Sequence, residues 1–418
     1  MLRDDAARRR VVAVMTFPES CRRTVFACVW AALALALLRA RAEVLQATGF
    51  ADPRLASLDA AMSAFVRTND IPRAQLAVAF HGTVVFNRAY TWMPDGAVPT
   101  DPTNCFRIAS VTKPMTAIAV MRLVESGKVG LDRRIAEWID VAGAKDPRWT
   151  NITVRHLLNH RGGWDRGASG DLMFRDADIA ARAGRALPVE RGDVIEFAKT
   201  QPLDFEPGTR YVYSNFGYLL LGRIIGKASG KSYPVFVKEK VFDRVGASGM
   251  HVGRSLAAHR IPGEVEYSQP DLPDEASVFG GGKVPVVQGG FNLENMDAHG
   301  GIVCPAEALV RVVSAFDDPS RSPLLSEAGI ASMWGRPPGG DPKAASYYAA
   351  GWLVRPVGEG RVNAWHDGSL PGTRAYLVRL ADGIMWAALL NRREKPGQPD
   401  FGGALDAGVN RETAVLVR

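Results

Sequence analysis

The chain has 418 residues, of which 47% are apolar and 23% are charged, a composition that excludes intrinsic disorder, collagen and coiled coil. The formal charge is +7, but residues 1–42 hold eight arginines against three acidic residues, so the rest of the chain carries only +2. A nucleic-acid-binding protein concentrates basic residues on its folded part, and this chain does not.

The N-terminal segment has the layout of an export signal. Basic residues up to Arg23 precede the uncharged run TVFACVWAALALALL, and small residues at positions 40 and 42 follow Arg39. A basic region, a short apolar region and small residues before a cleavage site are typical of secretory signal peptides. The run is shorter than the roughly 20 residues of a membrane-spanning helix, so an N-terminal anchor is the less favoured alternative. We expect residues 1–42 to direct export to the periplasm or the medium, and any membrane association to depend on this segment alone.

Hydrophobic periodicity predicts the first elements of the mature chain. Apolar residues at spacings of three and four between Leu55 and Phe65 predict an amphipathic helix. The runs QLAVAF and TVVFNRAY, separated by a His-Gly pair, predict a β-hairpin. The stretch 112–124 is apolar nearly all round and is followed by Gly127, which predicts a helix buried in the core.

The later elements return from helices to strands. Helical patterns dominate residues 153–246, and Pro305 opens a further amphipathic helix. The runs YYAAGWLVRP, RVNAWHDG, TRAYLVRL and IMWAALLNRR predict strands, with a tight turn at 381–383. Residues 262–298, rich in Pro and Gly, predict a long loop.

Strands at both ends with helices between them predict an α+β fold. We expect one antiparallel sheet built from about 70–110 and 345–393 and flanked by helices, plus a mostly helical lobe over about 130–300. A cleft should lie between sheet and lobe. The domain would span 43–400, and 401–418 would be a C-terminal tail.

Ser110 and Lys113, in RIASVTKP, lie three residues apart where the buried helix begins. Both side chains then face the same side of the first turn. The helix dipole stabilises negative charge near such a serine, and burial with the dipole favours the free amine of the lysine, a usable base. A helix cap with a solvated lysine is the structural alternative.

Tyr213, Ser214 and Asn215 lie between a Pro-Gly turn and an apolar helix. A tyrosine there can exchange a proton with a serine, and an asparagine amide can hold a substrate carbonyl. A core tyrosine with an asparagine cap would give the same pattern.

His366, Gly368 and Ser369 end the strand RVNAWHDG. Glycine beside a cleft lets a ligand approach the backbone, and the Ser369 N–H could donate to an oxyanion. His366 would place a polar or cationic group beside the nucleophile. A surface histidine before a turn is the alternative.

In this order, RIASVTKP, TVRHLLNHRGG, YVYSNFGYLLLGRIIG, HGGIVCPAEALVRV and WHDGSLPGT resemble the serine β-lactamase and D,D-peptidase-like superfamily. The similarity is to the branch with class C β-lactamases, D-aminopeptidases, D,D-carboxypeptidases and esterases, over residues 55–393. Its motifs are SxxK, YxN and an HxG in the place of KTG. The resemblance implies that Ser110 is the acylated nucleophile and that Lys113 and Tyr213 move its proton; which of the two is the base stays open.

For the substrate side, the resemblance implies that Asn215 positions the substrate and that the Ser110 and Ser369 N–H groups form the oxyanion hole. His366 takes the place of the KTG lysine. Losing that fixed cation, and gaining the negative Asp367 next to it, should weaken capture of an anionic β-lactam.

The sequence indicates no metal site and no cofactor. His156 and His160 are four residues apart, but the glutamate of an HExxH site is missing, and the resemblance assigns these histidines to packing. Cys105 and Cys304, beyond the export segment, form no CxxC pair. We expect both to be buried thiols, whether or not they meet.

These observations predict an exported serine hydrolase that cleaves a small ester or amide through an acyl-enzyme on Ser110. A D,D-peptidase or D-aminopeptidase acting on peptidoglycan-type peptides ranks second and a β-lactamase last. A penicillin-binding or scaffold protein without turnover is the rival from another class. Specificity should depend on the loop 262–298 and on Trp164.

Overall fold

The computed structural model describes residues 43–94 and 96–417, so the expected export segment lies outside the described residues. Two compact units are distinguished; the described residues of the first are 43, 44, 93, 94, 96 and 97, and those of the second are 45–92 and 98–417. Within the described residues, every helix is too short or too polar to pass through a bilayer.

The helices are α2 (Ala56–Thr68), α3 (Thr112–Glu125), α4 (Val154–Leu158), α5 (Asp176–Ala183), α6 (Arg191–Lys199), α7 (Asn215–Ser229), α8 (Tyr233–Val237), α9 (Ala306–Ser314), α10 (Glu327–Trp334) and α11 (Phe401–Thr413). The strands are β1 (Glu43–Ala51), β2 (Arg73–Phe80), β3 (Thr83–Pro94), β4 (Phe106–Arg107), β5 (His251–Val252), β6 (Glu275–Ala276), β7 (Lys283–Val284), β8 (Ile302–Cys304), β9 (Tyr347–Ala349), β10 (Trp352–Pro356), β11 (Val362–Leu370), β12 (Thr373–Arg379) and β13 (Ile384–Leu390).

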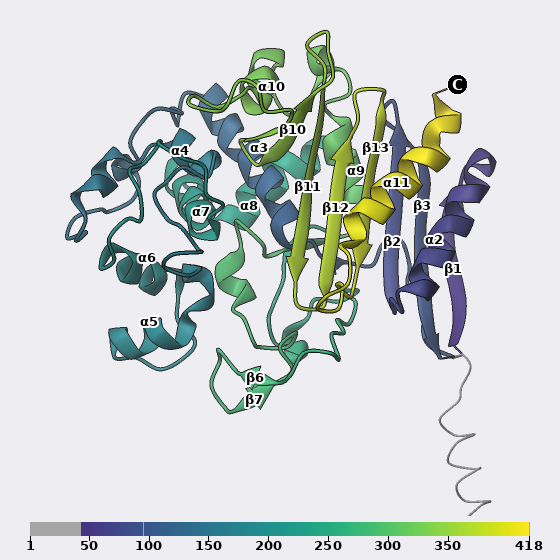
Figure 1. Ribbon diagram of the computed structural model, residues 1–418, viewed down its shortest axis with the longest axis horizontal. Coiled ribbons are helices and arrows are strands. Elements are labelled where there is room, and N and C mark those ends of the chain that lie inside the picture. Colours follow the sequence, from purple (N-terminus) through teal and green to yellow (C-terminus); the bar gives the residue numbers. More distant parts are fainter. Residues whose placement is uncertain (1–42, 95, 418) are drawn as a thin grey trace, which may run out of the picture. The chain divides into compact units, whose positions relative to one another are not determined.

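The main sheet joins strands from both parts of the chain, as expected. Its order is β1-β3-β2-β13-β12-β11-β10-β9, and the two parts meet where β2 pairs antiparallel with β13 (Figure 1). Two boundaries differ from the prediction. β1 adds residues from Glu43 onward, and β4 leaves the main sheet to pair with β8 in a small sheet with β5.

Both faces of the main sheet are covered, which explains why β13 is apolar throughout. Trp386 and Ala388 lie in a cluster with residues of α2 and α11. Ala387 and Leu389 point to the other face and lie in the larger cluster, with residues of α3 and α9. Side chains alternate between the faces of a strand, so only two covered faces make every position apolar.

The segment 401–418, expected to be a tail, instead begins with α11. Phe401, Leu405 and Val409 are buried at spacings of four residues, and the helix crosses one face of the sheet beside α2 (Figure 1). Asp400 caps its N-terminus by accepting from the Gly402 N–H. Burial of this stripe against the sheet makes the segment part of the domain.

Other local predictions are confirmed. His81 and Gly82 form the hairpin turn between β2 and β3 with φ angles of 45° and 76°, the backbone that such two-residue turns require. α3 has eleven buried residues among its fourteen. α9 follows Pro305.

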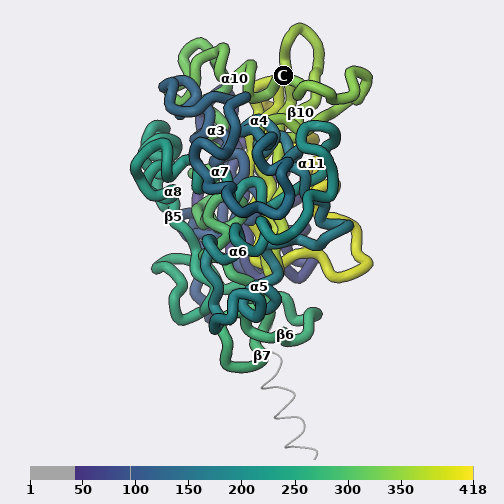
Figure 2. Tube along the Cα trace, turned by 90° about the vertical axis from the view of Figure 1, so that its left-hand side faces the viewer, coloured from purple at the N-terminus to yellow at the C-terminus, as the bar shows by residue number. Residues whose placement is uncertain are grey.

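The predicted helical lobe is formed by α4 to α8. Figure 2 views the molecule from the side of this lobe, with α4, α6 and α7 nearest the viewer. α7 packs against both α3 and α4, which ties the lobe to the core of the domain. The predicted loop 262–298 holds only the short β6–β7 pair and one 3-10 turn, Leu293–Met296.

Cys105 and Cys304 are buried and free. Cys105 Sγ donates to the Gly249 carbonyl at 3.2 Å, and burial raises the pKa of its thiol to about 11. Both are thiols inside the core, as expected, and they do not pair.

Candidate active site

Ser110 lies in a tight turn directly before α3. Ala109–Val111 form one 3-10 turn, and the α-helix begins at Thr112. Ala109 has a φ of 45°, a strained conformation for a residue other than glycine. The turn places Ser110 ahead of the positive end of the helix dipole, as the sequence predicted.

Strand β11 passes close to this turn because residue 368 is glycine. A Cβ on Gly368 would lie 2.3 Å from the Ile108 carbonyl oxygen and 3.0 Å from the Ser110 nitrogen. Both are backbone atoms, so neither can rotate away. Gly368 therefore sets the separation between the strand and the turn that holds Ser110.

We expect Gly368→Ala to lower kcat/KM about 100-fold, since a shift of reacting groups by about 1 Å has effects of that size. The clash should also reduce the free energy of unfolding by about 1–3 kcal/mol. Ester hydrolysis and chemical denaturation measure the two effects. Gly403→Ala in α11 is the matched control, because nothing lies within 4 Å of the added Cβ. Wild-type turnover in the Gly368 variant would contradict this steric argument.

Lys113 is fully buried and its amine contacts three groups. Nζ lies 3.1 Å from Ser110 Oγ, 2.8 Å from Asn215 Oδ1 and 2.9 Å from the His299 carbonyl oxygen. Burial lowers the pKa of this amine well below its usual 10.5, against the opposing charge of Asp171. A neutral amine donates twice and accepts once, which matches two carbonyl-type acceptors and one hydroxyl donor.

Tyr213 also contacts Ser110. Its phenol donates to Ser110 Oγ at 2.8 Å, and its ring lies 4.3 Å from the ring of His160 and 4.6 Å from Lys113 Nζ, centre to atom. Burial raises the pKa of Tyr213 far above that of a free tyrosine. The phenol therefore holds its proton at neutral pH.

Asn215 opens α7, but Ser214 is the residue that caps the helix, through the Gly217 N–H. The Asn215 amide is bonded at both ends, with Oδ1 accepting from Lys113 and Nδ2 donating to Asp171 Oδ2 at 2.6 Å. The carboxylate fixes which end of the amide faces the lysine. Asp171 was missed by the sequence analysis, because nothing in its neighbourhood marks it as a partner of a residue 44 positions away.

His366 lies on β11 and is 3% exposed. Its ring centre is 6.4 Å from that of Tyr213. Nδ1 is 2.5 Å from the Asp367 carbonyl oxygen and must donate to it, so Nε2 accepts from the Tyr348 hydroxyl at 3.1 Å. Burial lowers the pKa of His366 to about 4, which makes it neutral at pH 7. Tyr348 is a second partner that the sequence did not reveal.

The Asp367 carboxylate is not the free anion that the sequence suggested. It points away from His366, as neighbours on a strand do, and pairs with Arg374 at 2.6 Å. Arg374 also holds Glu394 at 3.0 Å. The negative charge of Asp367 is therefore paired with Arg374, on the face of the strand opposite His366. The expected repulsion of an anionic substrate is reduced by this pairing.

One edge of β11 is open beside Ser110. β10 pairs with β11 only as far as Trp365, so among the described residues the stretch 366–370 has a strand partner only in β12. Ser369 lies in this stretch with its side chain exposed. An extended substrate could pair with backbone groups of this edge.

The remaining sequence candidates divide between the site and the core. Trp164 is 6% exposed and stacks against Trp149 and Phe216, with ring centres 5.4 Å and 4.8 Å away. Trp164 is therefore a core residue, and its expected part in specificity stays a prediction. The loop 262–298 does reach the site, where Phe291 and neighbours pack on Ala109.

The two histidines of TVRHLLNH are engaged in the protein. His156 completes a capping box with Thr153, and His160 Nδ1 accepts the Ser214 N–H at 3.1 Å while its ring packs on Tyr213. Over residues 43–94 and 96–417, no three His, Cys, Asp or Glu side chains are grouped as metal ligands would be.

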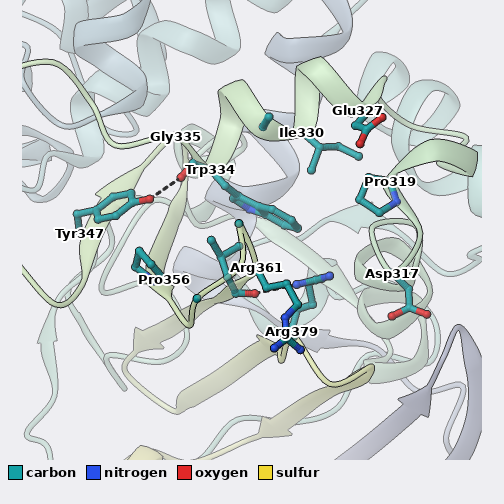
Figure 3. Close-up of a pocket in the computed structure, with 15 residues that line it drawn as sticks. Asp317, Pro319, Glu327, Ile330, Trp334, Gly335, Tyr347, Pro356, Arg361 and Arg379 are labelled. Atoms are coloured by element: carbon teal, nitrogen blue, oxygen red, sulfur yellow. Dashed lines mark hydrogen bonds between the residues drawn. The ribbon is translucent and has the colours of Figure 1, made fainter.

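A separate pocket of about 600 Å³ lies between α10 and the β9–β11 end of the sheet (Figure 3). Trp334, Tyr347, Arg361 and Arg379 are among its lining residues, and Ser110 is not. The catalytic candidates therefore do not share this cavity.

The family model described as Beta-lactamase matches residues 58–409. The chain is 30% identical over 230 residues to the probable fimbrial assembly protein FimD, serogroup H1, of Dichelobacter nodosus, covering 55% of this chain and 52% of that protein. It is 27% identical over 302 residues to penicillin-binding protein 4* of Bacillus subtilis, covering 71% and 62%. It is 29% identical over 210 residues to esterase EstB of Burkholderia gladioli, covering 46% and 50%.

Among solved structures, the D-amino acid amidase from Ochrobactrum anthropi SV3 superposes with a TM-score of 0.63 at 22% identity, covering 86% of this chain and 99% of that one. This likeness shows the fold. The chain spans about half the length of the curated relatives that it matches.

Proposed function

The chain belongs to the Beta-lactamase family, and from that premise we propose that it is a serine hydrolase that cleaves a small ester through an acyl-enzyme on Ser110. One observation carries the proposal. Ser110 Oγ contacts both a buried amine at 3.1 Å and a partly buried phenol at 2.8 Å. A hydroxyl so placed can lose its proton to one neighbour and pass a proton on through the other.

The directions of the two pKa shifts support the following roles. Burial lowers the pKa of Lys113 well below its usual value and raises that of Tyr213, which favours Lys113 as the group that takes the Ser110 proton as Oγ bonds to the substrate carbonyl carbon. Tyr213 then protonates the departing oxygen or nitrogen, and the proton held by Lys113 restores the phenol. Water repeats the sequence on the acyl-enzyme and frees Ser110. Lys113 and Tyr213 titrate as one coupled system.

The charge that develops on the carbonyl oxygen needs donors. The Ser110 N–H, at the turn before α3, and the Ser369 N–H, on the open edge of β11, are the two that we assign. Gly368 lets these backbones approach. Removing one such donor from an oxyanion hole costs about 10²–10³ in kcat, so this pair would supply a large share of the rate.

An ester ranks first as substrate because of the residue at position 366. His366 stands in the place of the KTG lysine and is neutral at pH 7, so this position provides no fixed cation. The similarity to esterase EstB supports the same class. An amide or peptide with D-amino acids is the second candidate, supported by the similarity to penicillin-binding protein 4* and by the fold shared with the D-amino acid amidase. Export through residues 1–42 remains part of the proposal.

Turnover of p-nitrophenyl butyrate tests the proposal. We expect many equivalents of p-nitrophenol per protein and a butyryl adduct of Ser110 by mass spectrometry after rapid acid quench. One equivalent with a stable adduct would identify a covalent penicillin-binding type of protein. No release and no adduct, with D-alanyl peptides and a chromogenic cephalosporin also inert, would leave a scaffold without catalysis.

A further inference from the structure

The pocket of about 600 Å³ beside α10 is lined by a buried arginine that has no carboxylate partner in the part of the chain that the structure describes. Arg379, at the end of β12, is 8% exposed. Among the described residues, no carboxylate oxygen lies within 4.0 Å of its nitrogens. Its two hydrogen bonds go to the neutral carbonyl oxygens of Val362, at 2.8 Å, and Phe316, at 3.2 Å. Buried charges in proteins are normally paired with an opposite charge, so this cation has room for an anionic ligand.

The side chains at this end of the pocket offer donors and lack an acceptor. A guanidinium has five N–H groups, and in the described structure Arg379 uses two of them, while its Nε has no partner. Trp334 also lines the pocket, with its ring centre 5.1 Å from the guanidinium carbon of Arg379 (Figure 3). The indole Nε1 of Trp334 likewise has no partner among the described residues. Both groups can only donate, so an oxygen acceptor is the group that this end of the pocket lacks.

The other charged residues of the lining limit the charge that a ligand can carry. Arg361 pairs with Glu359 at 3.4 Å, which leaves Arg379 as the cation to be balanced. Asp317 and Glu327 also line the pocket. Burial lowers the pKa of Arg379 even though the negative charge of Asp317 opposes that shift. Two acidic side chains in the lining repel a doubly charged phosphate, whereas a single carboxylate balances one guanidinium.

The remaining wall of the pocket is apolar. Ile330 and Trp334 come from α10, and Pro356 and Val362 come from β10 and β11. The ring of Tyr347 completes this wall, and its hydroxyl donates to the Trp334 carbonyl oxygen at 2.9 Å. Cavities of about 300–1,000 Å³ with apolar walls and a few polar groups are typical of sites for small molecules. The pocket therefore suits a ligand with an apolar body as well as a carboxylate.

We propose that this pocket is a second ligand site, which binds a monocarboxylate with an aromatic or aliphatic body through the guanidinium of Arg379. The carboxylate accepts N–H bonds from the guanidinium, whose planar donors suit this group, and the body packs on Trp334 and Ile330. Ser110 is not among the lining residues. The inference therefore goes beyond the proposed function and does not depend on it.

Isothermal titration calorimetry with 4-phenylbutyrate tests this inference. We expect the wild-type protein to bind 4-phenylbutyrate, and to bind the neutral 4-phenylbutanamide at least about tenfold more weakly, the size of a charge-assisted hydrogen bond. Arg379→Gln should weaken the binding of 4-phenylbutyrate at least about tenfold and leave that of the amide unchanged. Inorganic phosphate, which has no apolar body, should give no measurable binding.

A second variant tests the pocket without changing the arginine, because Arg379→Gln also removes hydrogen bonds within the fold. Ala331→Phe adds a ring to the pocket lining from an exposed position of α10, and should weaken the binding of 4-phenylbutyrate at least about tenfold by occupying the space for its body. Ala328→Phe is the matched control, because Ala328 is exposed on the same helix and is not a lining residue. It should bind the probe as the wild type does.

Three results would overturn the inference. The first is a wild-type protein that does not bind 4-phenylbutyrate at millimolar concentrations. The second is unchanged binding in either Arg379→Gln or Ala331→Phe. The third is inhibition of p-nitrophenyl butyrate hydrolysis by 4-phenylbutyrate that is competitive and equally strong in the wild type and Ala331→Phe, because the probe would then bind at Ser110. A protein that hydrolyses no ester but binds the probe as expected would refute the proposed function alone.

Discussion

Replacing Ser110 by alanine is expected to lower kcat/KM for p-nitrophenyl butyrate by at least about 10³-fold. The proposed reaction passes through a covalent bond to Ser110 Oγ, and in the part of the chain that the structure describes no other hydroxyl bonds to both Lys113 and Tyr213. The residual rate should come from the oxyanion donors alone. Steady-state kinetics measure the loss, and mass spectrometry should find no butyryl adduct on the variant.

The variant should remain folded, because the Ser110 side chain is only partly buried and no backbone bond depends on it. Ser229→Ala, at the exposed end of α7, controls for the loss of a serine as such and should retain full activity. A Ser110→Ala protein that hydrolyses the ester within about tenfold of the wild-type rate would remove the mechanism.

Lys113→Met is expected to lower the acylation rate about 10³-fold or more, at nearly constant side-chain volume. Methionine cannot accept the Ser110 proton and leaves the Asn215 and His299 oxygens without a donor. Stopped-flow measurement of the first turnover reports the effect on acylation itself. Acylation at the wild-type rate would mean that Lys113 is not the base.

The pH dependence gives an independent check. The wild-type rate should rise with pH as Lys113 loses its proton, with a midpoint well below 10.5, because burial lowers the pKa of this amine. Unfolding returns the amine to water, where it takes up a proton, so the wild-type stability should increase relative to Lys113→Met between pH 7 and 9. The slope is at most about 1.4 kcal/mol per pH unit. Equal pH dependence of stability in both proteins would mean that Lys113 is charged in the folded state.

Tyr213→Phe distinguishes the role of Tyr213 in proton transfer from that of Lys113. If Lys113 is the base, the variant should still lose turnover strongly, through poor protonation of the leaving group. The loss should be larger for an amide than for a p-nitrophenyl ester, whose leaving group needs no proton at neutral pH. Equal losses on both would assign the initial proton transfer to the phenol.

Much of the fold could be predicted from local patterns. The buried helix α3 and the β2–β3 hairpin have strong periodicity or turn chemistry within a few residues, which long-range packing did not alter. β1 and α11 were missed because their stability comes from distant partners. The apolar stripe of α11 is short, and the helix is stable because this stripe packs on one face of the main sheet.

The residues of the candidate site likewise fall into two groups, those that local sequence predicts and those that it does not. Ser110 and Lys113 could be recognised together because one turn of chain fixes their separation, and Tyr213, Asn215 and His366 because each belongs to a short motif. Asp171 and Tyr348, by contrast, become partners only when segments far apart in the chain meet.

The sequence by itself determined which side chains are available for chemistry and which local elements carry them, because helix and strand periodicity are properties of neighbouring residues. Only the tertiary structure decided their chemical states. Burial lowers the pKa of Lys113 well below its usual value and that of His366 to about 4, and strand alternation turns Asp367 toward Arg374. These outcomes depend on desolvation and on distances across the fold, which no local pattern encodes.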